Sequence, residues 1–248
     1  MKQPVCNKKV QSFQAHSSHP MPIIHPLFTS NDPLALALAV QAGSVELDLW
    51  VKNQERFPER DIAALPPHRQ LEHFAVDVVL QRLGWEAAQL RVVHGADGQP
   101  QIQSDDSSVS KWALSISHHS KGGLCHVLVA IGSKPLGCDI ECERKSIQQI
   151  AHRVFGPDEG TAESTLGRLS ALWTVKESMF KAFGPGLDFR KHLHVSLPTQ
   201  WDSEDPSTWT IEGHVHERAY HWHVSSRKSP VNNELFWICF GPQEIQAL

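Results

Sequence analysis

The chain has 248 residues, of which 40% are hydrophobic and 20% charged, with a formal net charge of −4. This length allows one large or two small domains with apolar cores, and the weakly acidic balance argues against a broad nucleic-acid-binding surface. Because no apolar run approaches the roughly 20 residues that span a bilayer, and the first residues lack the apolar core of a secretory signal, we expect neither a nucleic-acid nor a membrane partner.

Cysteine and histidine usage points to a reducing compartment. The five cysteines are an odd number and widely scattered, which is typical of free thiols in a cytoplasmic protein. Three His-x-His pairs occur among the 16 histidines, but no third ligand converges on any of them in the sequence. We therefore expect no structural zinc site at these pairs.

The N-terminal third of the chain combines an irregular segment with regular elements. Residues 1–44 are rich in proline, serine, histidine and glutamine around one apolar run, and we interpret them as an irregular extension carrying one short helix or strand. Residues 45–51 alternate apolar and polar side chains, which predicts a strand. An apolar stripe over 68–83, ended by Gly84, predicts a helix.

The middle of the chain predicts three consecutive strands. Residues 112–117 alternate, 118–123 form a polar turn, and 124–131 are continuously apolar. A second turn at 132–135 leads into an apolar run that ends at residue 141. Short turns between such runs predict an antiparallel meander.

The last 110 or so residues mix helices and strands. Ser146 can cap a short helix that Gly156 and Pro157 end, and a longer helix is predicted over 165–183, ended by Gly184. Strands are predicted near 192–197, 209–216, 220–225 and 234–240. The order of elements gives an α+β fold class.

Asp139 and Glu141 lie two positions apart on the strand that ends at residue 141. Side chains alternate faces along a strand, so both carboxylates point the same way. Two carboxylates side by side repel each other, and that repulsion is most easily tolerated where a cation lies between them. A solvent-facing acidic edge is the alternative interpretation.

The helix over 165–183 adds three charged residues to this picture. Lys176 falls within its apolar stripe, where an ammonium needs a buried partner or a phosphate, whereas Glu177 and Lys181 share one flank. Three carboxylates and two lysines on two rigid elements suit a magnesium–phosphate site. An i,i+4 ion pair between Glu177 and Lys181 is the alternative.

These residues form two motifs that resemble a known family. Gly-Cys-Asp-Ile-Glu (137–141) followed by Trp-Thr-Val-Lys-Glu-Ser-Met-Phe-Lys (173–181) resembles the signature of the 4′-phosphopantetheinyl transferases, in the family's order and at its spacing. The signature is a Gly-x-Asp-x-Glu strand followed by Trp-x-x-Lys-Glu-x-x-x-Lys. A lone Asp-x-Glu would mean little, but the coupled motifs are specific.

The resemblance implies a particular architecture. The longer, surfactin-synthetase-activating type of this family has two similar α+β halves that form a pseudo-dimer, with the active site at their interface. By this resemblance, residues 45–131 are the N-terminal half and 132–248 the C-terminal half, which carries the metal and catalytic motifs. We accordingly expect a monomer.

The resemblance also implies an activity and roles for the motif residues. Members of the family transfer 4′-phosphopantetheine from coenzyme A to a serine of an apo acyl or peptidyl carrier protein and release 3′,5′-ADP, with Mg²⁺ as cofactor. Asp139 and Glu141 would be metal ligands, and Glu177 the third ligand, the general base, or both. Lys181 would neutralise the diphosphate, and Lys176 would be a further catalytic lysine.

Coenzyme A contacts are implied in the N-terminal half. Ser117 and His118 belong to a segment that resembles the family's Ser-His-Ser element, although the doubled histidine also allows a register with His119. Arg69 resembles an arginine that contacts coenzyme A, with a surface arginine as the alternative. Gln99 stands where relatives usually have the lysine of Gly-Lys-Pro, and its amide cannot supply that positive charge.

Two other functions remain open from the sequence. One is a coenzyme A-binding module that has lost turnover, against which the complete set of charged motif residues argues. The other is a magnesium-dependent phosphohydrolase that uses the same acidic cluster. Such hydrolases usually need further ligands for a second metal, and the sequence offers no clear set.

Overall fold

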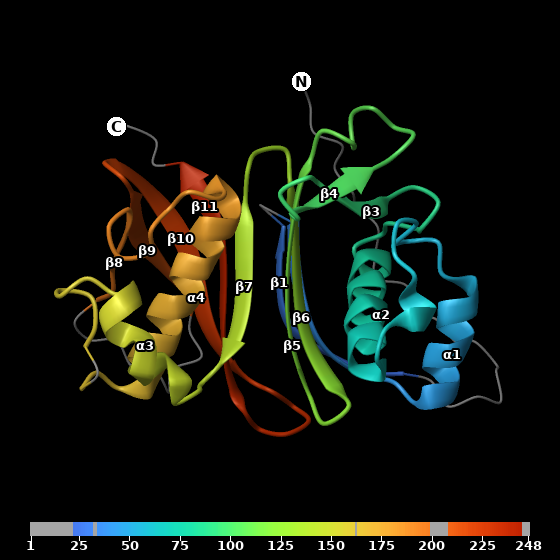
Figure 1. Ribbon diagram of the computed structural model, residues 1–248, viewed down its shortest axis with the longest axis horizontal. Coiled ribbons are helices and arrows are strands. Elements are labelled where there is room, and N and C mark those ends of the chain that lie inside the picture. The colour runs from blue at the N-terminus through green and yellow to red at the C-terminus, as the bar shows by residue number, and fades with distance from the viewer. Residues whose placement is uncertain (1–21, 32–33, 162, 199–207, 245–248) are drawn as a thin grey trace.

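Two antiparallel sheets, built from successive parts of the chain, organise the fold (Figure 1). The computed structural model describes residues 22–31, 34–161, 163–198 and 208–244. Within these residues the architecture is mixed α+β, with four α-helices and one short 3₁₀ helix. None of these helices has both the length and the apolar character needed to cross a membrane.

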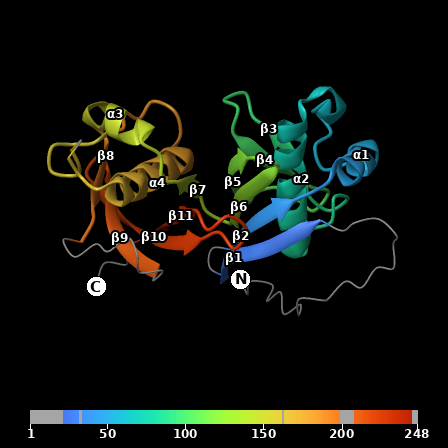
Figure 2. The ribbon, with the colours of Figure 1, turned by 90° about the horizontal axis from the view of Figure 1, so that it is seen from below.

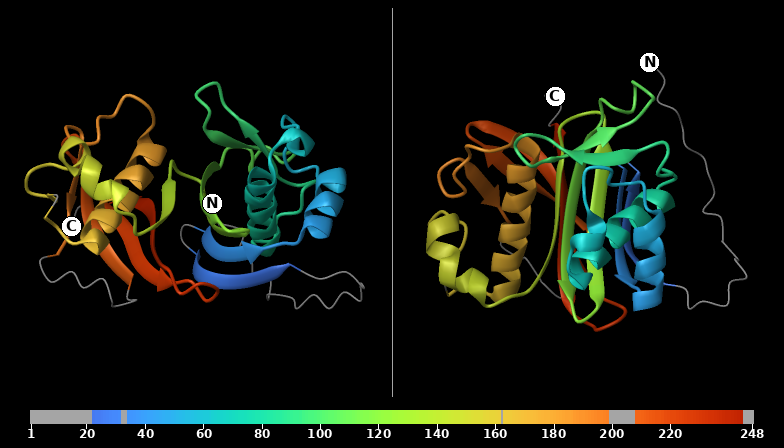
Figure 3. Two further views of the ribbon diagram at one scale, coloured as in Figure 1. Left: turned by 60° about the horizontal axis from the view of Figure 1, so that its bottom comes forward. Right: turned by 45° about the vertical axis from the view of Figure 1, so that its right-hand side comes forward.

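The N-terminal sheet has six strands in the order β1-β2-β6-β5-β4-β3. Its strands are β1 (Ile23–Asn31), β2 (Leu34–Gln41), β3 (Arg91–His94), β4 (Pro100–Gln103), β5 (Ala113–Lys121) and β6 (Leu124–Gly132). Helices α1 (Ser44–Asn53) and α2 (Pro67–Arg82), with the 3₁₀ helix η1 (Ile62–Ala64), lie on one face of this sheet (Figures 1 and 3).

The C-terminal sheet has five strands in the order β7-β11-β10-β9-β8. Its strands are β7 (Gly137–Cys142), β8 (Leu193–Ser196), β9 (Thr208–Val215), β10 (Arg218–Lys228) and β11 (Leu235–Glu244). Helices α3 (Ser146–Val154) and α4 (Leu166–Phe183) lie on one face of it (Figure 1).

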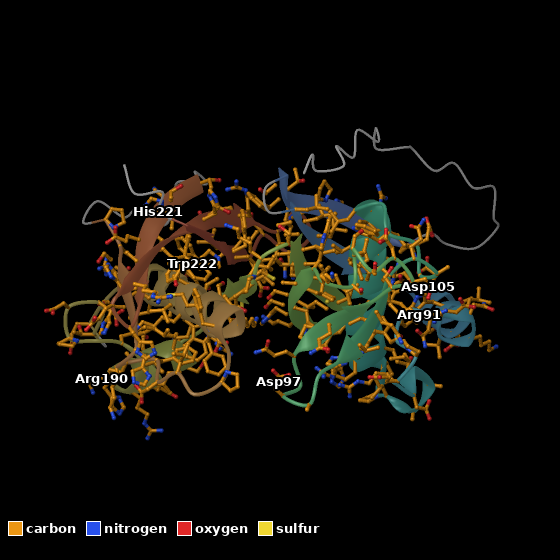
Figure 4. The ribbon with its side chains drawn as sticks, turned by 90° about the horizontal axis from the view of Figure 1, so that it is seen from above. Arg91, Asp97, Asp105, Arg190, His221 and Trp222 are labelled. Carbon is orange, nitrogen blue, oxygen red and sulfur yellow. The ribbon has the colours of Figure 1, made fainter. Side chains whose placement is uncertain are left out.

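Close packing of α4 against β7 fixes the position of the motif helix. A Cβ atom on Gly137 would collide with the backbone carbonyl of Ser178, so no side chain fits between this strand and the helix. Buried Leu172, Val175 and Met179 of α4 pack in the same core as Trp222, whose side chain is fully buried in the C-terminal sheet (Figure 4). The motif residues of strand and helix are therefore held on adjoining rigid elements.

A third apolar cluster joins the two sheets. It combines small residues of β2 and β6 with the inner faces of β7 and β11, and its buried members are Ala35, Ala37, Leu128, Ala130, Leu136, Cys138, Ile140, Phe236, Ile238 and Phe240. The alanines allow β7 and β11 to approach the N-terminal sheet closely. As a result β5 and β6 lie next to β7 between α2 and α4 (Figure 1).

The expectation of an irregular segment up to residue 44 is wrong for residues 23–41, and residues 1–21 lie outside the described residues. β1 and β2 pair over their whole length, and β2 pairs with β6 in the middle of the N-terminal sheet. Phe28 of β1 also packs on Phe240 of β11, with ring centroids 5.3 Å apart, and Figure 2 shows this hairpin beside β10 and β11. The alternating leucines and alanines of β2 are thus a sheet interior.

The strand predicted at 45–51 is instead helix α1. The backbone N–H of Gly43 donates to the Glu46 carboxylate (2.6 Å), which starts the helix, and Leu47 is the one buried residue of its apolar series. Val45 and Leu49 are 50% and 45% exposed. The period-two pattern was misleading because half of its apolar residues face solvent.

The predicted meander is correct for its first two strands and wrong for the third. β5 pairs with β6 as expected, but β5 continues to Lys121 and the turn is made by Gly122 and Gly123, which have φ of 60° and 77°. β7 pairs with β11, a strand almost 100 residues later, rather than with β6. The helices predicted over 68–83 and 165–183 and the four last strands are confirmed.

A candidate active site between the two sheets

Asp139 is the most constrained carboxylate of the molecule's centre. It is buried on β7, and its Oδ1 atom accepts hydrogen bonds from Lys181 Nζ and Ser117 Oγ, both at 2.7 Å. Its Oδ2 atom is also buried and has no hydrogen-bond partner among the described residues. A buried carboxylate oxygen without a donor is costly, which makes it a natural position for a cation.

Serine hydroxyls on β5 hold β7 in place without ladder pairing. Ser115 Oγ accepts from the backbone N–H of Cys138 (2.9 Å), and Ser117 Oγ accepts from that of Ile140 (3.2 Å). Both serines point toward β7 because they are two positions apart on β5. The prediction that Ser117 receives a coenzyme A phosphate is therefore replaced by a positioning role: its hydroxyl is committed to Asp139 and β7.

Glu141 lies on the same face of β7 as Asp139, as the alternation predicted. Its Oε2 atom pairs with Arg144 Nη2 at 2.9 Å, and its Oε1 atom lies 3.7 Å from His119 Nδ1. Burial raises its pKa to about 7; Asp139 adds to the rise and Arg144 opposes it. With both residues buried, the alternative of a solvent-facing acidic edge is excluded.

Glu177 and Lys181 approach this pair from α4, as predicted. Burial, and then the charge of Asp139, raises the pKa of Glu177 to about 7. Lys181 donates to Asp139 and to the carbonyl of Cys138 (3.1 Å). Burial opposes the charge of Lys181, but Asp139 outweighs it and the lysine pKa is raised. Lys181 thus pairs with Asp139 rather than with Glu177 in the described part of the chain.

The three carboxylates fit a hard divalent cation. Asp139, Glu141 and Glu177 offer only oxygen donors, which Mg²⁺ prefers. Burial raises the pKa of both glutamates and the charge of Asp139 adds to the rise, so a bound cation would favour their ionised forms. The partnerless Oδ2 atom of Asp139 is the structural observation that supports a bound ion here.

Lys176 does not reach this site. Its fully buried Nζ donates to Glu159 Oε2 (2.5 Å) and to the carbonyls of Val154 (2.9 Å) and Phe189 (2.8 Å). These three bonds use all of the N–H donors of an ammonium. The prediction of a catalytic Lys176 is therefore wrong in this structure, and the alternative of a buried partner applies.

The sequence analysis did not identify Glu159, the buried partner of Lys176. Its carboxylate also accepts from the backbone N–H groups of Gly156 and Val195, the latter at 2.7 Å. It thereby joins the end of α3, the middle of α4 and the start of the last sheet strands. The signal was the buried lysine itself, which required an acidic partner that spacing alone could not identify.

Arg69 and His118 come together at a cavity of about 210 Å³ in the N-terminal part. His118 is one position along β5 from Ser117, so its ring faces α2 instead of β7. Glu72 of α2 lies between the two: Arg69 Nη1 is 2.6 Å and His118 Nδ1 3.6 Å from its carboxylate. One further arginine and two further histidines line the cavity: Arg60, His73 and His94.

The electrostatics connect this cavity with the carboxylate cluster. Burial lowers the pKa of His118; Glu72 opposes the shift, and the charges of Arg69 and Lys181 reinforce it. Lys181 is therefore close enough to act on both the cavity and Asp139. A second cavity, of about 350 Å³, is lined by residues of the 156–159 and 190–194 segments and contains none of the predicted site residues.

Gln99 marks the side of the N-terminal part that faces α4. A Cβ atom on Gly184, just after α4, would lie 3.8 Å from the Gln99 side-chain nitrogen. Pro100 lines the 210 Å³ cavity. Figure 4 shows Asp97, on the same loop, directed toward the C-terminal part, where Arg190 lies on the segment after α4.

Comparison with known proteins gives a family match for the C-terminal part of the chain. A search of curated proteins found no match. Residues 135–241 match the family model of the 4′-phosphopantetheinyl transferase superfamily, a range that contains Asp139, Glu141, Glu177 and Lys181. Over these residues the chain is similar to the 4′-phosphopantetheinyl transferase superfamily, and this similarity supports phosphopantetheine transfer as the general class of activity.

Proposed function

We propose that this protein transfers 4′-phosphopantetheine from coenzyme A to a serine of an apo acyl or peptidyl carrier protein, with Mg²⁺, and releases 3′,5′-ADP. One observation carries the proposal. Within the matched range, Asp139 and Glu141 of β7 lie near enough to Glu177 and Lys181 of α4 to act on their charges, and the Oδ2 atom of Asp139 has no hydrogen-bond partner among the described residues. This donor set suits a metal-bound diphosphate.

Coenzyme A is assigned to the space from the 210 Å³ cavity to the carboxylate cluster. The arginines and histidines of the cavity wall, Arg69 and His118 among them, suit the phosphorylated nucleotide. Lys181 contacts Asp139 and its charge acts on His118 of the cavity wall, and we assign it to the diphosphate. The nucleotide would thus be bound by the N-terminal part and the reacting phosphate by the C-terminal part.

The transfer itself needs a proton acceptor and charge neutralisation. The serine oxygen forms a bond to the β-phosphorus, and the bond from that phosphorus to the oxygen of the leaving 3′,5′-ADP breaks. We assign the serine proton to Glu177, whose carboxylate has no hydrogen bond or ion pair among the described residues and whose pKa is raised to about 7. A base with a pKa near the working pH is effective.

Asp139, Glu141 and Glu177 would hold the magnesium ion, which supplies positive charge to the diphosphate when bound. Ser117 holds Asp139 at the correct position (2.7 Å), and Lys181 stabilises the charge that develops on the leaving phosphate. We further propose that the two parts of the chain correspond to the two α+β halves of the longer transferases, with the site at their interface, and that the protein is a monomer.

Incubation with coenzyme A, Mg²⁺ and several apo-carriers, read by intact mass, tests the proposal. We expect the carrier to gain one phosphopantetheine and 3′,5′-ADP to appear. Free phosphopantetheine without a modified carrier would indicate the hydrolase, and coenzyme A binding without turnover would indicate the binding module. Either result would overturn the proposal.

Asp139→Ala is the matched variant for this assay. Removal of a group that holds the metal and Lys181 should lower transfer by roughly 10²–10³-fold, as for other electrostatic catalysts. Calorimetry should show weaker Mg²⁺ binding in parallel. Transfer near the wild-type rate at low Mg²⁺ would contradict the ligand assignment.

A further inference from the structure

A second group of metal-ligand atoms lies at the edge of the carboxylate cluster. His119 of β5, Glu141 of β7 and Cys142 at the end of β7 bring one nitrogen, one oxygen and one sulfur within 4.8 Å of one another. His119 faces β7 because it is two positions beyond Ser117 on β5. Its ring is held by an edge contact with Phe236, with centroids 5.7 Å apart.

The distances match those of a tetrahedral ion. His119 Nδ1 is 3.8 Å from Cys142 Sγ and 3.7 Å from Glu141 Oε1. A tetrahedral zinc ion, with bonds of about 2.0–2.3 Å, holds its donor atoms about 3.3–3.8 Å apart. The other ring nitrogen of His119, Nε2, is 3.4 Å from Cys142 Sγ, and the backbone N–H of Cys142 donates to Glu141 Oε1 at 3.2 Å. The three side chains thus lie close enough together to share one ion.

We propose that His119, Glu141 and Cys142 form a site for a thiophilic divalent cation such as Zn²⁺. Thiolate and imidazole ligands select zinc and cobalt over magnesium, which distinguishes this set from the all-oxygen set of Asp139, Glu141 and Glu177. The His119 side chain is 25% exposed, so water can complete the coordination and the ion can enter from solvent. Three protein ligands and one open position are usual for an accessible zinc ion.

The shared carboxylate gives this site a consequence for activity. Glu141 directs Oε1 toward His119 and Oε2 toward Arg144, and it is also assigned to the magnesium ion. Zinc bound at Oε1 withdraws negative charge from the magnesium ligand set. Zinc therefore inhibits magnesium-dependent transfer; this consequence, unlike the binding itself, rests on the proposed function.

Titration with Co²⁺ alone tests the binding directly. Cobalt bound to a thiolate gives a ligand-to-metal charge-transfer absorption that surface histidines do not give. We expect the absorption in the wild type, its loss in Cys142→Ser, and much weaker cobalt binding in His119→Ala. Cys6→Ser is the matched control, because Cys6 lies outside the described residues and the other three cysteines, Cys125, Cys138 and Cys239, are buried. It should keep the absorption.

Circular dichroism and melting of each variant ensure that a lost absorption is not an unfolded protein. If Cys142→Ser is unfolded, alkylation of Cys142 in the wild type, protected by Zn²⁺ and mapped by mass spectrometry, replaces it. The proposal is overturned if the wild type gives no thiolate absorption, or if the absorption survives Cys142→Ser.

Asp139→Ala separates this inference from the proposed function. Asp139 is not a ligand of the sulfur-containing site, so this variant should keep the cobalt absorption while it loses transfer. In the wild type, low Zn²⁺ should inhibit transfer, and Cys142→Ser should be at least tenfold less sensitive. Absence of any transfer with an intact cobalt absorption would reject the proposed function and leave the metal site supported.

Discussion

The two parts of the molecule use the same construction for different polar environments. In each, helices lie on one face of an antiparallel sheet (Figure 1). α2 contributes Arg69 to a cavity rich in arginine and histidine, whereas α4 contributes Glu177 to a group of carboxylates. A ligand with a nucleotide phosphate and a metal-bound diphosphate needs both environments.

The comparison also explains why only residues 135–241 match the family model. The carboxylate side draws its residues from one strand and one helix, so their spacing is fixed and leaves a recognisable motif. The cavity side draws its residues from α2 and the segment before it, and from β3, β4 and β5. A cavity wall assembled in this way can exchange one cation for another and keeps no short signature.

The largest effect we predict concerns the two lysines of α4. Lys176 supports the fold through its buried contact with Glu159, whereas Lys181 belongs to the candidate active site. Lys176→Met should lower the free energy of unfolding by about 3–5 kcal/mol, because it leaves the buried Glu159 carboxylate without its cation. Lys181→Met should cost much less stability and instead lower kcat more than it raises KM, since the proposed function assigns its ammonium to the diphosphate. Urea unfolding and steady-state kinetics on both variants measure the contrast.

A matched control strengthens this pair. The double variant Lys176→Met/Glu159→Gln removes both buried charges and should recover part of the lost stability, because a buried pair is worth less than the cost of breaking it. If Lys176→Met were fully stable and catalytically impaired, the assignment of Lys176 to the frame would be wrong.

The sequence predicted the carboxylate side better than the frame around it. Asp139 and Glu141 were placed on one face of a strand, and Glu177 and Lys181 on one flank of a helix, because the periods of strand and helix are local properties. The partner of β7 was missed since β11 is distant in the chain. The two strands also pack with the small residues Ala35 and Ala37 of β2 in one apolar cluster, a contact between distant segments that local sequence patterns do not predict.

Two predictions from the sequence were wrong because they relied on local patterns alone. Alternation over 45–51 predicted a strand, but Gly43 and Glu46 start a helix there, and this cap outweighs a weak strand preference. Ser117 has the right position for the family's serine, yet its hydroxyl is taken by Asp139. No local rule predicts which of several nearby polar groups a hydroxyl selects.

The second prediction concerns the carboxylate side and pH. Glu141 and Glu177 have folded pKa values near 7, above the usual carboxyl value, so without metal their contribution to stability is present below about pH 4.5 and is lost as pH rises through 7. In the proposed site Mg²⁺ would bind the ionised carboxylates and offset that loss. Mg²⁺ should therefore raise the free energy of unfolding by roughly 2 kcal/mol more at pH 8 than at pH 5. The melting temperature should rise more at pH 8 accordingly.

Thermal unfolding with and without Mg²⁺ at both pH values gives this difference, in which the titration of other groups cancels. Asp139→Ala should abolish the pH-dependent gain, since it removes a ligand of the same ion. An equal gain from Mg²⁺ at pH 5 and pH 8 would show that the ion binds elsewhere.

The smallest effect we predict tests the cation-rich side at Gln99. Its side chain lies beside Gly184, between the end of α4 and the cavity that Pro100 lines, and an amide there adds no charge. Gln99→Lys should lower KM for coenzyme A by several-fold, or about 1 kcal/mol for one added charge-assisted contact, with kcat nearly unchanged because the contact is remote from bond breaking. Gln99→Met, of similar size without charge, is the control. If the added lysine contacts the 3′-phosphate, the KM for dephospho-coenzyme A should change little. An equal decrease in KM for both substrates would place the lysine at the diphosphate instead. No decrease for either substrate would show that Gln99 lies away from the nucleotide site.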